Sequence, residues 1–363
     1  MAQVPPRHGG NLQQAALRLG CAPEQLLDFS ASLVPFAPPA AVRRGLRQAL
    51  ALQVYPDRSY SALRQAIALR HQVPAAAVLP GNGAAELFTW AARDAADLGL
   101  NHLPAPGFAD YERALRCWQG RWRHEHLQLP HQQAGPQALP AAFQSQLADL
   151  QGPLWLTNPH NPTGQLWSQE SLLALLERVP LLIVDEAFLP LVPGGEQHSL
   201  VQLASQHPRL VVIRSLTKLF GIAGLRLGYA IAEPQRLQRW SQWRDPWPVN
   251  GLAAAAGERL MADAAWTNKV QAWVATERPW LADQLVRRGW QVSPSSCNFL
   301  LVQRGHPLEN WRQQLEQQHR ILVRDCRSFT GLDERWWRLA LLDRPRNRRL
   351  LRALDQVQAT DRA

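Results

Sequence analysis

One residue in this sequence offers chemistry that most of its other basic residues cannot. Of 39 basic residues, only Lys218 and Lys269 are lysines, and the rest are arginines. Arginine serves well in an ion pair, a phosphate contact or a solvated surface, but its guanidinium stays protonated. A lysine amine can lose its proton and attack a carbonyl carbon, so Lys218 is a candidate nucleophile. A bias toward arginine would explain why lysine is rare, but not where Lys218 lies.

The neighbours of Lys218 include groups that bind phosphate. In the segment SLTKLFGIAGLRLGY, Ser215 and Thr217 offer hydroxyls and Arg226 offers a guanidinium. Such donors make strong hydrogen bonds to phosphate oxygens. Upstream, the glycines of GNGAAEL would let backbone N–H groups approach an anion at a helix N-terminus. A dinucleotide site is the alternative for GNGAAEL, but the third glycine and the acidic strand end of that motif are missing.

Two further segments place a carboxylate and an amide where strands are expected to end. Asp185 ends an apolar run, and a buried carboxylate there needs a cationic partner such as a protonated heteroaromatic nitrogen. A helix N-cap is the alternative role for this aspartate. The segment NPHNPTG predicts a rigid turn that fixes Asn161, whose buried amide should be hydrogen-bonded. An amine, an acid, an amide donor and a phosphate cradle together meet the needs of pyridoxal phosphate.

Short apolar runs alternate with longer helical patterns along the chain. This alternation predicts an α/β fold with a largely parallel sheet, whose ligands bind at the carboxyl ends of the strands. The expected strands of a first domain are AAAVLP, LWLT, LLIVDE, LVVIRS and LGYAIA. After about Pro248, long helices are followed by two apolar runs, CNFLLVQ and WWRLALL, which we interpret as strands of a smaller domain.

We expect three parts in the chain. Residues 1–48 form an N-terminal arm and part of the small domain, residues 49–250 a large cofactor-binding domain, and residues 251–363 a small C-terminal domain. The apolar content of 46% over 363 residues is ample for this core. No signal-peptide pattern or membrane-length apolar stretch is present, and the four cysteines have no zinc spacing. We therefore expect a cytoplasmic protein without a metal site.

The formal net charge of +10 raises the question of nucleic-acid binding. The arginines are spread from Arg7 to Arg362, and no helix-turn-helix, zinc-finger or RNP-type pattern is present. An anionic small-molecule substrate accounts equally well for a basic balance. We therefore expect neither nucleic acid nor a membrane as a partner.

The ordered set of segments resembles the fold-type I pyridoxal-phosphate enzymes, in the aminotransferase class that includes histidinol-phosphate aminotransferase. The similarity extends over essentially the full length. It implies a large domain with a mostly parallel seven-stranded sheet, pyridoxal 5′-phosphate as cofactor, and a homodimer with shared active sites. It also implies that Lys218 condenses with the cofactor aldehyde, Asp185 pairs with the ring nitrogen and Asn161 bonds the phenolic oxygen.

The remaining cofactor contacts are implied by the same resemblance. Phe108 of PAPGFADY would stack on the ring, and Tyr55 of VYPD would reach the cofactor phosphate of the neighbouring subunit. Phe188 stands where many relatives have a tyrosine that also bonds the phenolic oxygen, so Asn161 would act with less help. The residues expected to hold the phosphate are Gly83, Ala84, Ser215, Thr217 and Arg226.

In its substrate-binding segments the sequence is more similar to the threonine-phosphate decarboxylases of cobalamin biosynthesis. The segments that fit are RHGGN, RDC followed by F-x-GLD, the arginine of WWRLA, and DEAF in place of a tyrosine version. The expected reaction converts L-threonine O-3-phosphate to (R)-1-amino-2-propanol phosphate. The resemblance implies that Arg338 clamps the substrate carboxylate. The residues expected around the substrate's phosphate are Arg324 and His8, with Gly9 beside them and Ser30 or Ser32 assisting.

Each of these substrate residues has an alternative role. His8 could belong to an unstructured arm, Arg324 could pair with Asp325 on the surface, and Arg338 could simply occupy the inward face of a strand. SLVPF replaces an asparagine-containing segment after DFSA, which leaves strict threonine-phosphate specificity open. Two other functions also remain. One is a histidinol-phosphate or related aminotransferase, and the other is a pyridoxal-fold regulator that binds DNA, although no appended DNA-binding domain is recognisable.

Overall fold

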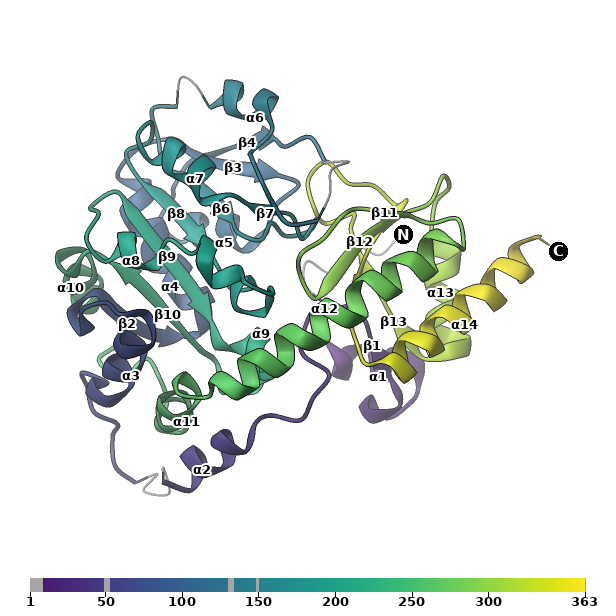
Figure 1. The fold of residues 1–363 in the computed structure, drawn as a ribbon, viewed down its shortest axis with the longest axis horizontal. Helices are drawn as coiled ribbons and strands as arrows, with labels where there is room; N and C mark the ends of the chain where they lie inside the picture. Colours follow the sequence, from purple (N-terminus) through teal and green to yellow (C-terminus); the bar gives the residue numbers. More distant parts are fainter. Residues whose placement is uncertain (1–8, 49–52, 130–133, 148–149, 363) are drawn as a thin grey trace.

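Two α/β bodies, connected by a long helix, make up the protein (Figure 1). The computed structural model describes residues 9–48, 53–129, 134–147 and 150–362. Helix α12 (Ala264–Val286) starts near α11 (Gly251–Met261), beside the larger body, and extends along the smaller one. The active-site candidates of the sequence lie on segments from both bodies.

A seven-stranded sheet forms the centre of the larger body. Neighbouring strands are parallel except at β10, which is antiparallel to both β2 and β9. The predicted fold class, with its mostly parallel seven-stranded sheet, is therefore confirmed. In spatial order the strands are β2 (Val78–Asn82), β10 (Leu227–Ala232), β9 (Leu210–Ser215), β8 (Leu182–Asp185), β6 (Leu154–Thr157), β3 (Asn101–Ala105) and β4 (Trp122–His126).

The side chains of the central strands alternate between two hydrophobic cores, one on each face of this sheet. In β9, Leu210 and Val212 belong to one core, whereas Val211 and Ile213 belong to the other. Strands that are buried on both faces need continuous apolar runs, which is why the sequence reveals them. Strands β3 and β4, by contrast, have the sequences NHLPA and WRHEH, which carry a proline or charged residues and were not expected.

Helices cover both faces of the large sheet. The first core includes residues of α3 (Ser61–His71), α6 (Ala141–Gln146), α7 (Gln169–Leu176), α8 (Val201–Ala204) and α9 (Leu216–Phe220). The second core includes residues of α4 (Gly83–Ala96), α5 (Asp110–Arg116) and α10 (Pro234–Trp243). Helices α4 and α9 follow β2 and β9 directly, so the carboxyl ends of these two strands lead straight into helix N-termini.

The smaller body has a four-stranded antiparallel sheet in the order β11 (Gln291–Val292), β12 (Phe299–Gln303), β15 (Trp336–Ala340) and β14 (Arg324–Asp325). This body also contains the helices α13 (Glu309–His319) and α14 (Arg344–Arg362), which pack against each other. The N-terminal segment, with α1 (Leu12–Leu19), joins this body because β1 (Leu27–Asp28) pairs in parallel with β13 (Ile321–Leu322). The division at residues 250 and 251 stays a prediction, and α11, which follows it, packs against α2 (Ala40–Gln48) and α3.

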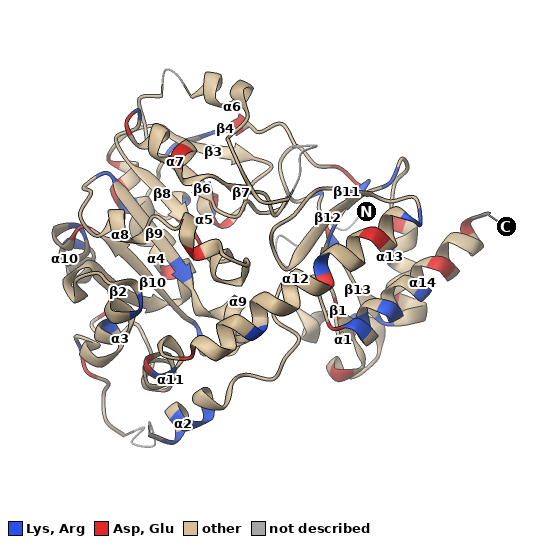
Figure 2. Ribbon diagram, viewed as in Figure 1, with Lys and Arg blue, Asp and Glu red and all other residues tan. Residues whose placement is uncertain are grey.

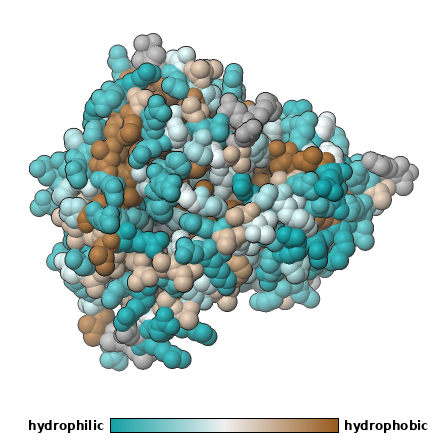
Figure 3. Space-filling view, viewed as in Figure 1, coloured by the Kyte–Doolittle hydropathy of each residue, from teal (hydrophilic) through white to brown (hydrophobic). Residues whose placement is uncertain are grey.

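Charged side chains of both signs are distributed over the two bodies (Figure 2). Basic positions are frequent on α2 and α14, and blue and red segments are scattered over the other elements of both bodies. On the face shown in Figure 3, apolar side chains form separate patches among hydrophilic ones. Within the described residues, no helix has the length and apolar character needed to cross a membrane. All four cysteines are free thiols.

A buried cluster of ion pairs lies beside the end of β8, on the face of the sheet that carries the first core. Arg214 of β9 is 1% exposed and donates from Nε to Glu186 Oε2 at 2.8 Å and from Nη1 to Glu196 Oε1 at 2.9 Å. Glu186 is fully buried and follows Asp185 directly in the chain. The cluster therefore restrains the backbone that presents Asp185.

We expect Arg214→Met to lower the free energy of unfolding by about 3–5 kcal/mol, because it leaves the carboxylate of Glu186 buried without its cation. Urea unfolding of the holoprotein at neutral pH measures this loss. The matched control is Arg209→Met, whose pair with Glu177 is long (3.7 Å) and exposed, and which should cost at most about 1 kcal/mol. Equal losses in the two variants would contradict this role of Arg214.

Candidate active site

One cavity brings most of the predicted site residues together. It encloses about 210 Å³ and is lined by the ends of β8 and β9, by the start of α4, and by segments of the smaller body. Phe88, Asp110, Ser328 and Phe329 are among its further lining residues. The predicted residues on its wall are Gly9, Ser30, Ser32, Ala84, Phe108, Asn161, Asp185, Ser215, Thr217, Lys218, Arg226, Arg324 and Arg338.

Two predicted residues in the described part of the chain are not on this wall. Gly83 lies just behind it, beside Arg226. Tyr55 is 73% exposed and stacks on Trp247 with ring centroids 4.3 Å apart, next to a different pocket. A contact of Tyr55 with a neighbouring subunit therefore stays a prediction. His8 lies outside the described residues.

Lys218 lies on α9, just after β9, and its side chain is partly exposed to the cavity. Burial, together with the positive charges of Arg338 and Arg226, lowers the pKa of its amine from 10.5 to about 8, although the charge of Asp185 opposes this change. The Nζ atom lies 5.5 Å from the ring centroid of Phe188. An amine with this pKa has a substantial neutral, nucleophilic fraction close to neutral pH.

Asp185 is the buried acid that the sequence predicts. Burial raises the pKa of its carboxyl from 3.8 to about 6, although hydrogen bonds from Ala187 and Tyr111 and the charge of Lys218 oppose this rise. Its Oδ1 accepts from the backbone N–H of Ala187 at 2.9 Å, as a turn aspartate would. Its Oδ2 accepts from the hydroxyl of Tyr111 at 2.8 Å. The carboxylate therefore stabilises a turn, without being the N-cap of a helix, and also lines the cavity, while its pairing with a ring nitrogen stays a prediction.

Tyr111 is a site residue that the sequence analysis missed. Its hydroxyl contacts Thr157 Oγ1 at 2.7 Å as well as Asp185, and its side chain is buried. It fixes one carboxylate oxygen of Asp185 and leaves the carboxylate's position well defined. The one feature of the sequence that could have indicated it is its position three residues after Phe108, in the first turn of α5.

The turn NPHNPTG holds Asn161 at the cavity. Asn158 anchors the turn, since its Oδ1 accepts from the N–H of Trp167 at 2.8 Å. Asn161 has the partner that its burial requires, because its Oδ1 accepts from Nη1 of Arg338 at 2.6 Å. The hydrogen bond assigns the amide oxygen to Arg338 and leaves the Nδ2–H groups as donors for another ligand.

Arg338 lies on β15 and connects the smaller body to the larger one. Besides its bond to Asn161, it donates from Nη2 to the backbone oxygen of Ser30 at 3.3 Å. Its guanidinium carbon lies 5.1 Å from the ring centroid of Phe299. Burial and the nearby Arg324 lower its pKa to about 10, so it remains a cation at neutral pH. Its Nε is buried and finds no hydrogen-bond partner among the described residues.

Arg324 of β14 is the second buried arginine on the same wall. The alternative of a surface pair with Asp325 is wrong, because Arg324 is only 3% exposed. Its Nη2 donates to Ser328 Oγ at 2.5 Å, and its guanidinium carbon lies 5.3 Å from the ring centroid of Phe329. Burial lowers its pKa from the usual value for arginine.

The two serines considered for the substrate differ in their bonding. The hydroxyl of Ser30 donates to Asp28 Oδ1 at 2.6 Å and accepts from the N–H of Gly10 at 2.9 Å. Ser32 is 1% exposed, and its hydroxyl has no hydrogen-bond partner in the described part of the chain. Gly9 packs closely on Ser30, and a Cβ at this position would collide with the backbone of Ser30.

A phosphate cradle is recognisable at the opposite wall. Gly83 opens α4 with a φ of +75°, and a Cβ added to it would lie 2.5 Å from Nη2 of Arg226. Ser215, Thr217 and Ala84 complete this wall with hydroxyls and a helix N-terminus. Because N–H groups at a helix start favour anions, the donors present fit a phosphate.

The chain belongs to the aminotransferase class I and II family, whose model matches residues 24–354. It is 37% identical to the threonine-phosphate decarboxylase of Salmonella typhimurium over 98% of both chains. It is 33% identical to the histidinol-phosphate aminotransferase of Anaeromyxobacter sp. over 73% of this chain and 72% of that protein. Its fold is similar to the crystal structure of histidinol-phosphate aminotransferase from Sinorhizobium meliloti in complex with pyridoxal-5′-phosphate, with a TM-score of 0.85, 20% identity, and coverage of 99% and 98%.

These comparisons confirm the predicted family, fold and cofactor. The protein is an enzyme of the pyridoxal-phosphate-dependent aminotransferase class. Its cavity fits the cofactor because it combines an amine of lowered pKa, a buried carboxyl and a glycine-edged anion cradle.

We expect Gly83→Ala to weaken pyridoxal-phosphate binding about 10-fold or more, because the new Cβ strains the left-handed backbone and displaces Arg226. Equilibrium dialysis of the cofactor measures the change. Gly99→Ala is the matched control, since Gly99 also has a positive φ (+108°) but has open space around its Cβ position. If Gly83→Ala retained the cofactor as well as Gly99→Ala, this cradle would be excluded.

Proposed function

We propose that this protein decarboxylates L-threonine O-3-phosphate to (R)-1-amino-2-propanol phosphate, a step of cobalamin biosynthesis. The observation that carries the proposal is the pair of buried arginines, Arg338 and Arg324, on one wall of the cofactor cavity. A substrate with both a carboxylate and a phosphate needs two such cations. The 37% identity to a threonine-phosphate decarboxylase over 98% of the chain supports the same substrate.

In this proposal Lys218 holds the cofactor, Asp185 faces its ring nitrogen, and Asn161 donates from Nδ2 to its phenolic oxygen. The chemistry that pyridoxal phosphate would supply there, when bound, is an electron sink for the substrate bond that breaks. Phe108 lines the cavity and would be the aromatic that stacks on the ring. The phosphate contacts are Gly83, Ala84, Ser215, Thr217 and Arg226.

Arg338 would select the bond that breaks. Its Nε is buried and has no partner among the described residues, and Nε together with the adjacent Nη presents a fork that matches a carboxylate. The orientation of the substrate carboxylate decides which bond breaks, and a guanidinium clamp on the fixed strand β15 would impose one orientation. Asn161 and the backbone of Ser30 restrain the guanidinium on its other nitrogens.

Two groups would complete the reaction. Lys218, whose pKa of about 8 leaves the free amine largely protonated at neutral pH, would act as the acid that supplies the proton replacing the carboxylate on the α-carbon. Arg324 would bind the substrate phosphate. Ser32 is a better candidate than Ser30 for a substrate contact. The hydroxyl of Ser32 has no hydrogen-bond partner among the described residues, whereas that of Ser30 already donates to Asp28. His8, which lies outside the described residues, would bind the substrate phosphate with Arg324, and Gly9 would lie beside the substrate.

A histidinol-phosphate aminotransferase is the second candidate, favoured by the 33% identity to one such enzyme. Histidinol phosphate has no carboxylate, so Arg338 would then serve the amino-group acceptor. A DNA-binding regulator has less support, because the enzyme family accounts for residues 24–354. We also propose a homodimer, in which the exposed Tyr55 reaches the partner's cofactor phosphate.

We expect the holoenzyme to release carbon dioxide from L-threonine O-3-phosphate without any keto acid. Arg324→Gln should raise KM for this substrate about 10- to 100-fold, because it removes a charged hydrogen-bond donor to the phosphate. Carbon dioxide release and product analysis measure both effects. Glutamate formed from histidinol phosphate and 2-oxoglutarate, with no carbon dioxide from threonine phosphate, would overturn the proposal in favour of the aminotransferase.

A further inference from the structure

The turn that follows β14 forms part of the cavity wall. From the sequence, no substrate contact was expected for the serine in this turn. Ser328 and Phe329 both line the cavity beside Arg324. Ser328 Oγ accepts from Arg324 Nη2 at 2.5 Å. Because the hydroxyl uses a lone pair in this bond, its own proton remains available to an acceptor. No such acceptor is found among the described residues, so the donor is left to the cavity.

We propose that Ser328 is a further substrate-binding residue, which donates a hydrogen bond to the phosphate group of the substrate beside Arg324. This inference rests on the proposed function, because it takes a phosphorylated substrate as given. A dianionic phosphate offers only hydrogen-bond acceptors. It would bind to the guanidinium of Arg324 and the hydroxyl of Ser328, which are hydrogen-bonded to each other. An uncharged substrate group could not use both donors as well.

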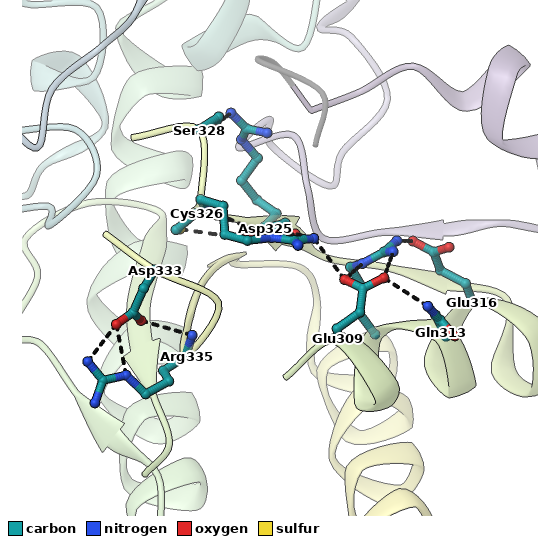
Figure 4. A network of polar contacts seen from close by, with 11 residues as sticks. Glu309, Gln313, Glu316, Asp325, Cys326, Ser328, Asp333 and Arg335 are labelled. Atoms are coloured by element: carbon teal, nitrogen blue, oxygen red, sulfur yellow. Dashed lines mark hydrogen bonds and ion pairs between the residues drawn. The ribbon is translucent and has the colours of Figure 1, made fainter. Parts of the chain in front are cut away.

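Ion pairs hold this turn from the side that faces away from the cavity (Figure 4). Successive side chains of a strand point to opposite faces, so Arg324 faces the cavity while Asp325 faces α13. Asp325 accepts from the backbone N–H of Arg327 at 2.9 Å and from its Nε at 2.9 Å. Arg327 also donates from Nη2 to Glu309 Oε2 at 2.8 Å, at the start of α13. These contacts on either side of Cys326 fix the backbone that presents Ser328.

The same cluster continues to the N-terminal segment. Arg312 joins Glu309 at 2.5 Å to Glu316 at 2.6 Å, and Glu316 pairs with Arg18 of α1 at 2.6 Å. Helix α1 follows Gly9, which lies on the cavity wall. The cluster thus restrains two segments of the wall relative to each other. A binding hydroxyl that is held in place in this way loses little freedom when its ligand arrives.

The test compares Ser328→Ala with the matched variant Thr330→Ala in the holoenzyme. Thr330 is exposed on the same turn and lies outside the lining of the cavity. The KM for L-threonine O-3-phosphate is measured from carbon dioxide release, and the dissociation constants of L-threonine and inorganic phosphate are measured by calorimetry. We expect Ser328→Ala to weaken the two phosphate-containing ligands about 10-fold and to leave L-threonine unchanged, because only the phosphate loses a charged hydrogen bond. Thr330→Ala should bind all three as the wild type does.

Two results would overturn the assignment of Ser328. One is unchanged phosphate binding in Ser328→Ala, and the other is an equal loss for L-threonine, which would indicate only a structural role. Failure of the proposed function has a different signature, because the wild type would then release no carbon dioxide from L-threonine O-3-phosphate, whatever Ser328→Ala does to phosphate binding. Rescue of phosphate binding by Ser328→Thr, which restores the hydroxyl, would support the assignment even if Ser328→Ala folds poorly.

Discussion

Burial disfavours the charged forms of two groups in one cavity, the amine of Lys218 and the carboxyl of Asp185. The rest of the structure depends on the ligand that can bind both groups. Burial lowers the pKa of Lys218 to about 8 and raises that of Asp185 to about 6. An amine that is easily deprotonated can condense with an aldehyde, and a carboxyl in an apolar surrounding gains most from a cationic partner. Pyridoxal phosphate offers an aldehyde to the first group and a ring nitrogen to the second. The cavity is thus suited to a ligand that satisfies both groups at once.

The sheet explains why these two groups meet. Strands β8 and β9 are parallel neighbours, with Asp185 opposite Ile213, so the segments that follow both strands emerge at the same edge. On the other side of Asp185, Tyr111 fixes the carboxylate, while Arg214 and Glu186 hold the backbone behind it. The smaller body then adds Arg338 and Arg324, and the bond from Arg338 to Asn161 joins the substrate wall to the cofactor wall.

The sequence revealed features that are local and missed those that depend on packing between distant segments. The central strands and the turns that carry Asn161, Asp185 and Lys218 were predictable, because burial on both faces and short turn motifs leave clear patterns. Strands β3 and β4 were missed because their residues are partly polar. Tyr111 and Ser328 carry no motif of their own, and only their contacts with Asp185 and Arg324 identify them. The bond between Arg338 and Asn161, 177 residues apart, could not be read from the sequence.

The most direct measurement follows covalent attachment of pyridoxal phosphate to the cofactor-free protein, trapped by borohydride and mapped by peptide mass spectrometry. The chain offers two lysine side chains for this attachment, Lys218 and Lys269. A lowered pKa means that the amine becomes neutral at a lower pH, so the account predicts attachment at Lys218 with an initial rate that rises through pH of about 8. Attachment at Lys269, or a rate at Lys218 that rises only as the pH nears the ordinary lysine value of 10.5, would contradict it.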